Sequence, residues 1–266
     1  MTAPARPILR SSILAAGSGA PVLLLHGSAS TSAMWTPVID VLKPRFRVLA
    51  PDLIGYGRTD SWPNGHEFSL DDEVRLVAPL LANQHAAHVV AHSYGGVVAL
   101  ELARSHRDLV RSLTLIEPVA FHVLRDASDP GPWSEAEELG RTYAAQMAAG
   151  ETEAALRRFV DYWAEPGAWD AMDEGARAQM RRVAPKMVLD FQAVLPDRGP
   201  DAWRDIEPPA RLLAGDKSPL PVRRIAAILA RRLPSASLRV VAGANHLLPA
   251  THHRMLSAFL LEKLDD

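Results

Sequence analysis

Short apolar segments alternate with longer amphipathic segments along most of the chain, and this alternation limits the choice of folds. The apolar segments have the length of strands and are apolar throughout, which is typical of strands buried on both faces of a parallel sheet. The amphipathic segments have the apolar spacing of helices that cover such a sheet. We therefore predict an α/β fold with a mostly parallel sheet flanked by helices. The predicted strands span 21–26, 45–50, 87–92, 110–116, 210–214 and 237–242, and the predicted helices span 31–43, 69–83, 94–105, 220–232 and 251–264.

Two regions depart from this alternation. At the start of the chain, segments at about 7–9 and 12–15 can add an antiparallel pair to the edge of the sheet. Between 119 and 207 the strand pattern disappears, and helical patterns separated by Pro and Gly take its place. We predict an inserted all-helical cap over 119–207 and a core made of 1–118 and 208–266. The predicted cap helices span 134–149, 151–164, 169–183 and 185–194.

Composition excludes several classes of protein. The chain has 266 residues, of which 48% are hydrophobic, and no cysteine, so disulfides, cysteine nucleophiles and thiolate metal sites are excluded. Its formal charge of −2 gives no reason to expect nucleic acid or an anionic membrane as a partner. The first residues contain no apolar stretch of signal-peptide length, and the longest apolar runs have the length of strands. We expect a soluble, cytoplasmic protein.

A serine stands between a predicted buried strand and a predicted helix. The segment 91–95 reads Ala-His-Ser-Tyr-Gly, a nucleophile elbow with Ala in place of the first Gly of G-x-S-x-G. Small residues are needed two positions either side of the serine, because the turn is so tight that larger side chains collide with neighbouring backbone. The turn exposes the oxygen of Ser93, and the N-terminus of the following helix favours developing negative charge. This placement predicts a catalytic nucleophile.

Three further motifs follow the order found in one family. His26-Gly27-Ser28 resembles an oxyanion-loop HG motif, the segment 51–59 resembles the D-x-x-G-x-G-x-S/T loop, and 243–246 resembles the G-x-x-H turn that carries a catalytic histidine. With the elbow, they make nearly the whole chain resemble the α/β-hydrolase superfamily. The resemblance implies the α/β-hydrolase fold and a Ser-His-acid mechanism. It implies that Ser93 is the nucleophile, that His246 is its base, and that the backbone N–H groups of Ser28 and Tyr94 form the oxyanion hole.

The third member of the triad departs from the family pattern. Most relatives have an aspartate in a G-x-x-D sequence after the strand that corresponds to 210–214, but Ser218 stands at that place here. Asp216, two residues earlier, is one replacement. Glu117, directly after strand 110–116, is the other, and certain haloalkane dehalogenases place their acid at that strand end. We favour Glu117, since a carboxylate at the carboxyl edge of a parallel strand lies where site residues collect.

The resemblance and the serine together predict a carboxylic-ester hydrolase that forms an acyl-enzyme on Ser93. A thioesterase, a lactonase, a C–C bond hydrolase or a perhydrolase can use the same triad, and an inactive binding protein with this fold is an alternative of another class. The expected partner is a small-molecule acyl substrate, with no metal and no organic cofactor. The natural substrate, the oligomeric state and the mobility of the cap stay open. The predicted pocket residues, beside Tyr94, are Trp35, Phe121, His122, Trp163 and Trp169.

Overall fold

A computed structural model describes residues 6–82, 84–125, 127–199 and 202–264. The strands of this part of the chain form one sheet in the order β1-β3-β2-β4-β5-β6-β7. All neighbouring pairs are parallel except β1 and β3, which are antiparallel. The predicted α/β-hydrolase fold, with helices flanking a mostly parallel sheet, is therefore confirmed. The strands are β1 Ile13–Ala16, β2 Ala20–Leu25, β3 Phe46–Pro51, β4 Ala87–His92, β5 Val110–Ile116, β6 Ala210–Gly215 and β7 Ala236–Val241.

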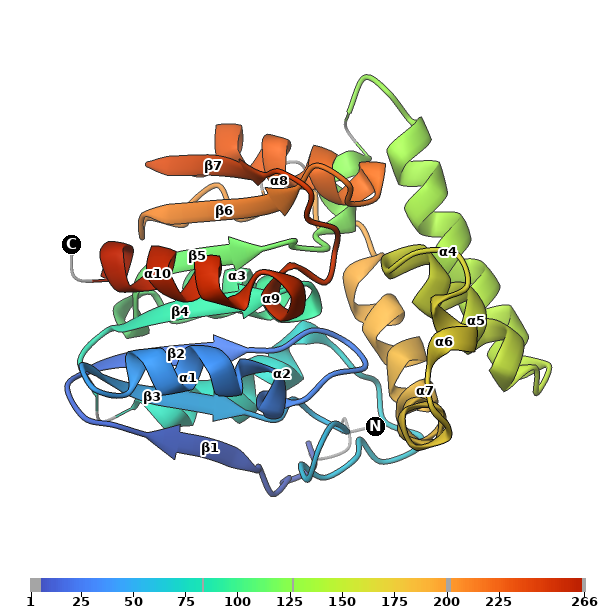
Figure 1. Cartoon of the computed structure of the whole chain (residues 1–266), viewed down its shortest axis with the longest axis horizontal. Coiled ribbons are helices and arrows are strands. Elements are labelled where there is room, and N and C mark those ends of the chain that lie inside the picture. The colour runs from blue at the N-terminus through green and yellow to red at the C-terminus, as the bar shows by residue number, and fades with distance from the viewer. Residues whose placement is uncertain (1–5, 83, 126, 200–201, 265–266) are drawn as a thin grey trace, which may run out of the picture.

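Helices cover both faces of the sheet (Figure 1). Alternate residues of β2 face opposite ways: Val22 and Leu24 belong to the apolar cluster under α1 and α10, whereas Leu23 and Leu25 belong to the cluster shared with α2, α3 and α8. The continuous apolar runs of the central strands arise from this burial on both faces. The helices are α1 Thr36–Leu42, α2 Leu70–Val77, α3 Tyr94–Ser105, α4 Gly131–Ala148, α5 Thr152–Trp163, α6 Ala168–Ala171, α7 Glu174–Val194, α8 Leu220–Arg232, α9 Leu248–Thr251 and α10 His253–Leu264, with 3-10 turns η1 Ser32–Trp35, η2 Ala78–Leu81, η3 Arg107–Leu109 and η4 Phe121–Leu124.

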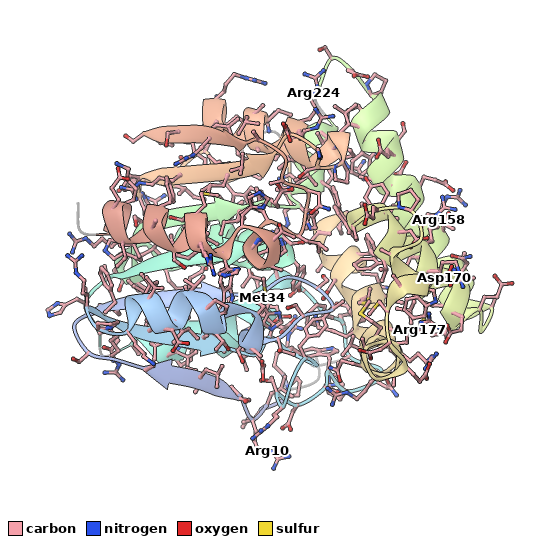
Figure 2. The ribbon with its side chains drawn as sticks, in the orientation of Figure 1. Arg10, Met34, Arg158, Asp170, Arg177 and Arg224 are labelled. Atoms are coloured by element: carbon pink, nitrogen blue, oxygen red, sulfur yellow. The ribbon has the colours of Figure 1, made fainter. Side chains whose placement is uncertain are left out.

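The helices α4–α7 lie between β5 and β6 in sequence and gather at one end of the sheet (Figure 1). Their outer surface is charged: Arg158 and Asp170 are exposed, and Figure 2 shows them pointing away from the sheet domain. Apolar residues of the same helices pack into the cluster that also contains α3 and β5. The boundaries at 118/119 and 207/208 stay a prediction.

Two details of the predicted secondary structure are wrong. Residues 7–9 form no strand, so β1 alone makes the antiparallel edge; Pro7 has no N–H to donate to a ladder, and Ile8 is exposed. The helices predicted at 169–183 and 185–194 are instead a short α6 and one continuous α7 with Pro185 inside it. Proline removes one helical hydrogen bond, but the apolar face of α7 is buried on both sides of it, at Val183 and Met187, and this packing holds the two halves in line.

None of the helices in the described residues is both long enough and apolar enough to cross a lipid bilayer.

Candidate active site

Ser93 occupies a strained turn between β4 and α3. Its backbone has φ 54° and ψ −118°, in the left-handed half of conformational space that only special contexts stabilise. Its N–H donates to the carbonyl oxygen of Ile116 at 2.9 Å, which fixes the turn to the neighbouring strand β5. A Cβ at Gly95 would lie 2.5 Å from the carbonyl oxygen of His26, closer than real Cβ contacts come. The requirement for a small residue at this position therefore has a definite steric cause.

His246 lies on the loop after β7, with its imidazole against the serine. The distance from its Nε2 to Ser93 Oγ is 3.0 Å. The indole of Trp163 lies over the imidazole with ring centroids 4.1 Å apart, and Nε2 of His92 is 2.9 Å from the carbonyl oxygen of His246. Burial lowers the pKa of His92 to about 3, so this second ring stays neutral near neutral pH and adds no positive charge beside His246. His92 thus contacts the backbone of the histidine loop, a role that sequence analysis did not assign to it.

The glutamate after β5, and not the aspartate after β6, reaches the imidazole. Glu117 is fully buried, and its Oε2 is 3.2 Å from Nδ1 of His246. Its Oε1 accepts hydrogen bonds from the backbone N–H of Gly215 and, at 2.9 Å, from the hydroxyl of Ser218. Ser218, which stands at the position of the aspartate in the G-x-x-D pattern, therefore helps to orient the carboxylate of Glu117. Asp216 instead accepts a bond from the backbone N–H of Gly243 at 2.8 Å, at the surface.

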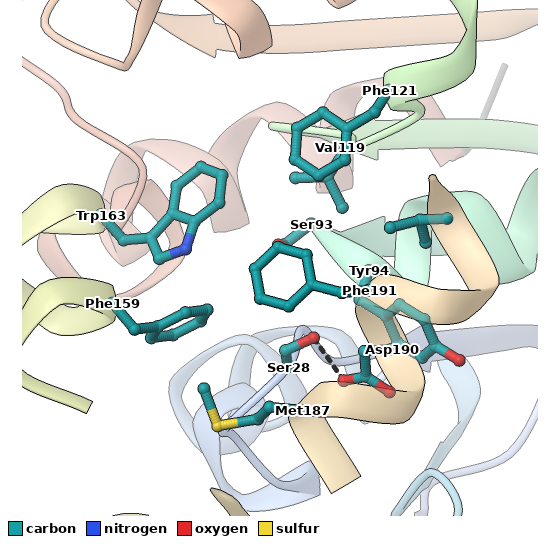
Figure 3. Close-up of a pocket in the computed structure, with 11 residues that line it drawn as sticks. Ser28, Ser93, Tyr94, Val119, Phe121, Phe159, Trp163, Met187, Asp190 and Phe191 are labelled. Atoms are coloured by element: carbon teal, nitrogen blue, oxygen red, sulfur yellow. Dashed lines mark hydrogen bonds between the residues drawn. The ribbon is translucent and has the colours of Figure 1, made fainter. Parts of the chain in front are cut away.

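The two residues predicted to form the oxyanion hole lie beside Ser93. Tyr94 is the first residue of α3, a position whose backbone N–H has no acceptor within the helix. Ser28 follows Gly27, and a Cβ on Gly27 would lie 2.9 Å from the Cβ of Ser93, so only glycine lets this loop approach so closely. Both Ser28 and Tyr94 line a cavity together with Ser93 (Figure 3). Their oxyanion role itself belongs to the proposal below.

A buried charged cluster lies behind the oxyanion loop. The side chain of Asp190 on α7 accepts hydrogen bonds from the hydroxyls of Ser28 and Tyr56, both at 2.5 Å, and from Lys186. Lys186 also pairs with Glu73 at 3.1 Å. Burial lowers the pKa of Lys186, but the two carboxylates outweigh burial and hold its pKa above the usual value. With two carboxylates and one ammonium, the cluster carries one net negative charge when all three groups are ionised.

Sequence analysis missed this cluster. Lys186 and Asp190 are four residues apart on a helix, a spacing that usually indicates a solvent-exposed ion pair. Glu73 lies in the first turn of α2, where an acidic residue has an ordinary explanation in the helix dipole. No local signal distinguishes these residues from surface charges, because their burial depends on how α7 packs against the loop after β3.

Two cavities adjoin Ser93. Both are lined by Ser28, Ser93, Phe159 and Trp163. The larger, of about 460 Å³, extends along His246 and is otherwise mostly apolar, with methionines at 34, 172 and 180. The smaller, of about 20 Å³, extends the other way; Figure 3 shows Val119 and Phe121 on one side of it and Phe191 and Asp190 on the other.

The structure brings together only part of the predicted pocket. Trp163 lines both cavities, and Tyr94 and Phe121 line the smaller one. Three other predicted pocket residues, Trp35, His122 and Trp169, line neither, so the structure does not support those assignments. Trp35 packs in the cluster under α1, Trp169 is buried among the inserted helices, and His122 packs edge-on against Trp203 with ring centroids 4.5 Å apart.

These three residues were predicted to line the pocket because they are aromatic. The direction in which each side chain points depends instead on its position around its short helix.

Among the described residues, no group of three or more His, Asp or Glu side chains is arranged to hold a metal ion.

Comparison with known proteins identifies the family. A family model described as the alpha/beta hydrolase family matches residues 22–258. The chain is 28% identical over 246 residues to the 2-(acetamidomethylene)succinate hydrolase of Mesorhizobium japonicum, a match that covers 86% of this chain and 82% of that protein. It is 34% identical over 110 residues to the probable lysophospholipase BODYGUARD 2 of Arabidopsis thaliana, where the match covers 38% of this chain and only 23% of the relative.

Solved structures agree with this result. An alpha/beta hydrolase from Sphaerobacter thermophilus superposes with a TM-score of 0.74 at 25% identity, over 95% of this chain and 96% of that one. The enol-lactonase from Burkholderia xenovorans superposes with a TM-score of 0.75 over 97% of this chain and 96% of that one, and its 18% identity supports the fold alone. The family match, which spans residues 22–258, shows that this chain belongs to the alpha/beta hydrolase family.

Proposed function

We propose that this hydrolase cleaves carboxylic esters through an acyl-enzyme on Ser93. The observation that supports the proposal most strongly is the hydrogen-bonded series of Ser93 Oγ, His246 and Glu117, with distances of 3.0 Å and 3.2 Å on the two sides of the imidazole. A serine hydroxyl is a weak nucleophile unless a base takes its proton during attack. The imidazole has that position, and the carboxylate behind it favours the tautomer with the proton on Nδ1.

Acylation forms one bond, breaks another, and moves one proton from Ser93 through His246 to the leaving alcohol. Ser93 Oγ attacks the ester carbonyl carbon while its proton passes to Nε2 of His246, and the carbonyl oxygen becomes an oxyanion near the N–H groups of Ser28 and Tyr94. Collapse of this intermediate breaks the bond to the alkoxy oxygen, which takes the proton from Nε2 and leaves as the alcohol. Glu117 stabilises the positive imidazolium that exists between the two transfers. Loss of one oxyanion donor typically costs on the order of 100- to 1000-fold in rate.

Deacylation repeats these chemical steps with water as the nucleophile. Water gives a proton to Nε2 of His246 as its oxygen bonds to the acyl carbon, and Ser93 recovers that proton as the carboxylic acid leaves. No metal or organic cofactor takes part in these steps.

We further propose that residues 119–207 act as a cap that shapes the substrate pocket. Phe159 and Trp163 on α5 line both cavities at Ser93, and Phe191 on α7 lines the smaller one. These lining side chains support the proposal that the inserted helices limit the access of water to the candidate nucleophile and select the substrate by shape.

A substrate panel tests the proposed reaction. Purified protein is assayed with alkyl esters, acyl thioesters, lactones and vinylogous diketones, each alongside the Ser93→Ala variant. We expect ester hydrolysis that Ser93→Ala lowers by at least about 1000-fold. Greater activity on one of the other three classes would move the assignment to that chemistry. No turnover of any class would favour a binding protein with this fold. Equal ester turnover by Ser93→Ala would refute the nucleophile.

A further inference from the structure

The space around Ser93 is strongly unequal on its two sides. A cavity of about 460 Å³ extends along His246, whereas the cavity on the side of Val119 and Phe121 has only about 20 Å³. A volume of about 10–15 Å³ holds one water molecule, so the small cavity accepts a methyl or a slightly larger group. A tetrahedral intermediate at Ser93 has two substituents besides its oxyanion and the serine oxygen, and these two must occupy unlike spaces.

The chemistry decides which substituent takes which side. The leaving oxygen must receive its proton from Nε2 of His246, so the alcohol part has to lie on the side of that imidazole. His246 lines the large cavity and not the small one. The acyl chain is left with the small cavity, which is lined by Phe121, Phe191 and Val194. The expected substrate therefore has a short acyl chain and a large alcohol.

The side chains of the large cavity indicate the character of the alcohol. Met34, Met172 and Met180 supply flexible apolar surface, which adapts to irregular shapes, and Leu247 and Pro249 extend it. Figure 2 shows Met34 on the sheet domain, apart from the charged residues Arg158, Asp170 and Arg177 of the inserted helices. None of the described residues that line this cavity is Asp, Glu, Lys or Arg, so a charged alcohol would lose its hydration without a partner.

The small cavity disfavours an anionic acyl group. Asp190 lines it, and the ionised carboxylate of Asp190, which belongs to the cluster with Lys186 and Glu73, places negative charge on the cavity wall. The Lys186 ammonium is already paired with both carboxylates, so it is not available to a substrate carboxylate. An acyl chain that ends in a carboxylate would meet this negative charge in a buried place, where repulsion is poorly screened.

We infer that this protein hydrolyses esters of acetyl-sized, uncharged acyl groups with bulky, neutral, apolar alcohols. The inference rests on the proposed ester hydrolysis and deepens it.

Two isomeric esters test the inference. Octyl acetate and ethyl octanoate are isomers with similar apolar area and unactivated alkoxy leaving groups. Octyl acetate has a short acyl group and a long alcohol, whereas ethyl octanoate has a long acyl group and a short alcohol. We expect kcat/KM for octyl acetate to exceed that for ethyl octanoate by on the order of 100-fold, since even one unaccommodated methylene costs about 10- to 200-fold. Equal rates, or a preference for ethyl octanoate, would overturn the inference and leave ester hydrolysis standing. If neither ester is hydrolysed although a fluorophosphonate labels Ser93, the inference is also overturned. If the protein shows neither turnover nor labelling, the proposed function itself is refuted.

A pair of variants tests the side assignment. Val194→Ala enlarges the small cavity and should raise the ratio of butyrate to acetate hydrolysis by about tenfold. Met180→Ala removes similar apolar bulk from the large cavity only, and should leave that ratio within about twofold of its starting value. The opposite outcome, in which Met180→Ala and not Val194→Ala admits longer acyl chains, would reverse the assignment of the two sides.

Discussion

Replacing Glu117 with Gln exchanges one carboxylate oxygen for an amide nitrogen at the back of the imidazole. The amide oxygen can still accept from Gly215 and Ser218, as Oε1 of the carboxylate does. The amide nitrogen then faces Nδ1 of His246, and because it can only donate, it favours the tautomer with the proton on Nε2. That tautomer presents an N–H to Ser93 and is unable to take the serine proton.

The electrostatic part of the loss follows from the distance between the carboxylate and the imidazole. Coulomb's law gives about 5 kcal/mol for unit charges separated by the 3.2 Å between Glu117 Oε2 and His246 Nδ1, at an effective dielectric constant of about 20. A loss of about 5 kcal/mol from the transition state corresponds to a fall in kcat of about 10⁴-fold. The same carboxylate-to-amide exchange in a serine-protease triad also costs about 10⁴-fold, largely through the wrong tautomer.

The assay is steady-state ester hydrolysis, with Asp216→Asn as the matched control. Both variants replace a carboxylate with an amide. Asp216, however, lies at the surface, where it accepts a hydrogen bond from the backbone N–H of Gly243. We expect the control to stay within about twofold of the parent, as surface substitutions usually do. Circular dichroism and thermal unfolding verify that Glu117→Gln is folded. A folded Glu117→Gln protein with kcat within tenfold of the parent, or a larger loss in Asp216→Asn, would refute the assignment of the acid.

Three further substitutions test the surroundings of the site. Asp190→Asn removes one of the two carboxylates that hold buried Lys186; we expect a loss of about 3 kcal/mol in the free energy of unfolding in urea, together with a lower kcat. His122→Phe removes a buried imidazole whose pKa burial lowers to about 4. Because the unfolded chain binds the proton at a pKa near 6.5, stability falls as pH drops from about 6.5 to about 4, and the variant should avoid a loss of about 2 kcal/mol at pH 5. Gly95→Ala places a Cβ 2.5 Å from the carbonyl oxygen of His26, which should cost about 1–3 kcal/mol of stability and about 100-fold in kcat.

Each of these predictions has its own control. Asp190→Asn is compared with Asp170→Asn, an exposed aspartate of the inserted helices, which should unfold at nearly the parent's urea concentration. The stability of His122→Phe relative to the parent should rise by about 2 kcal/mol as the pH falls from 8 to 5, and parallel pH profiles would contradict the lowered pKa of His122. Gly175→Ala, whose Cβ meets only the carboxylate of Asp173, should not lower stability as Gly95→Ala does.

The proximity of Ser93 and His246 could be predicted because each residue stands in a short contiguous pattern. A buried strand, a tight turn and a helix specify the position of Ser93 within a few residues, and parallel strands bring their carboxyl ends to one edge of the sheet. The same rule placed Glu117 near Ser93, since β4 and β5 are neighbours with His92 paired to Ile116. The choice between Glu117 and Asp216 needed coordinates, because it depends on the direction of two side chains from adjacent strands.

The inserted helices were harder to predict. Pro185 marked a helix end in the sequence, yet burial of the surrounding apolar face keeps α7 continuous. Lys186 and Asp190 have the spacing of a surface pair, and their burial comes from contacts with residues more than a hundred positions away, such as Tyr56. Local patterns carry no information about such contacts, so both the buried cluster and the shapes of the two cavities emerge only from the packing of α5 and α7 against the sheet domain.

Covalent labelling tests the central claim most directly. The folded protein is treated with an alkyl fluorophosphonate, its intact mass is measured, and the modified peptide is sequenced by mass spectrometry. We predict one adduct per chain on Ser93, no adduct in Ser93→Ala, and much slower labelling in His246→Gln, because the imidazole that lies 3.0 Å from the serine oxygen activates it. A folded protein that stays unlabelled at Ser93, or that labels as fast without the imidazole, would contradict the claim that these residues form a working nucleophile.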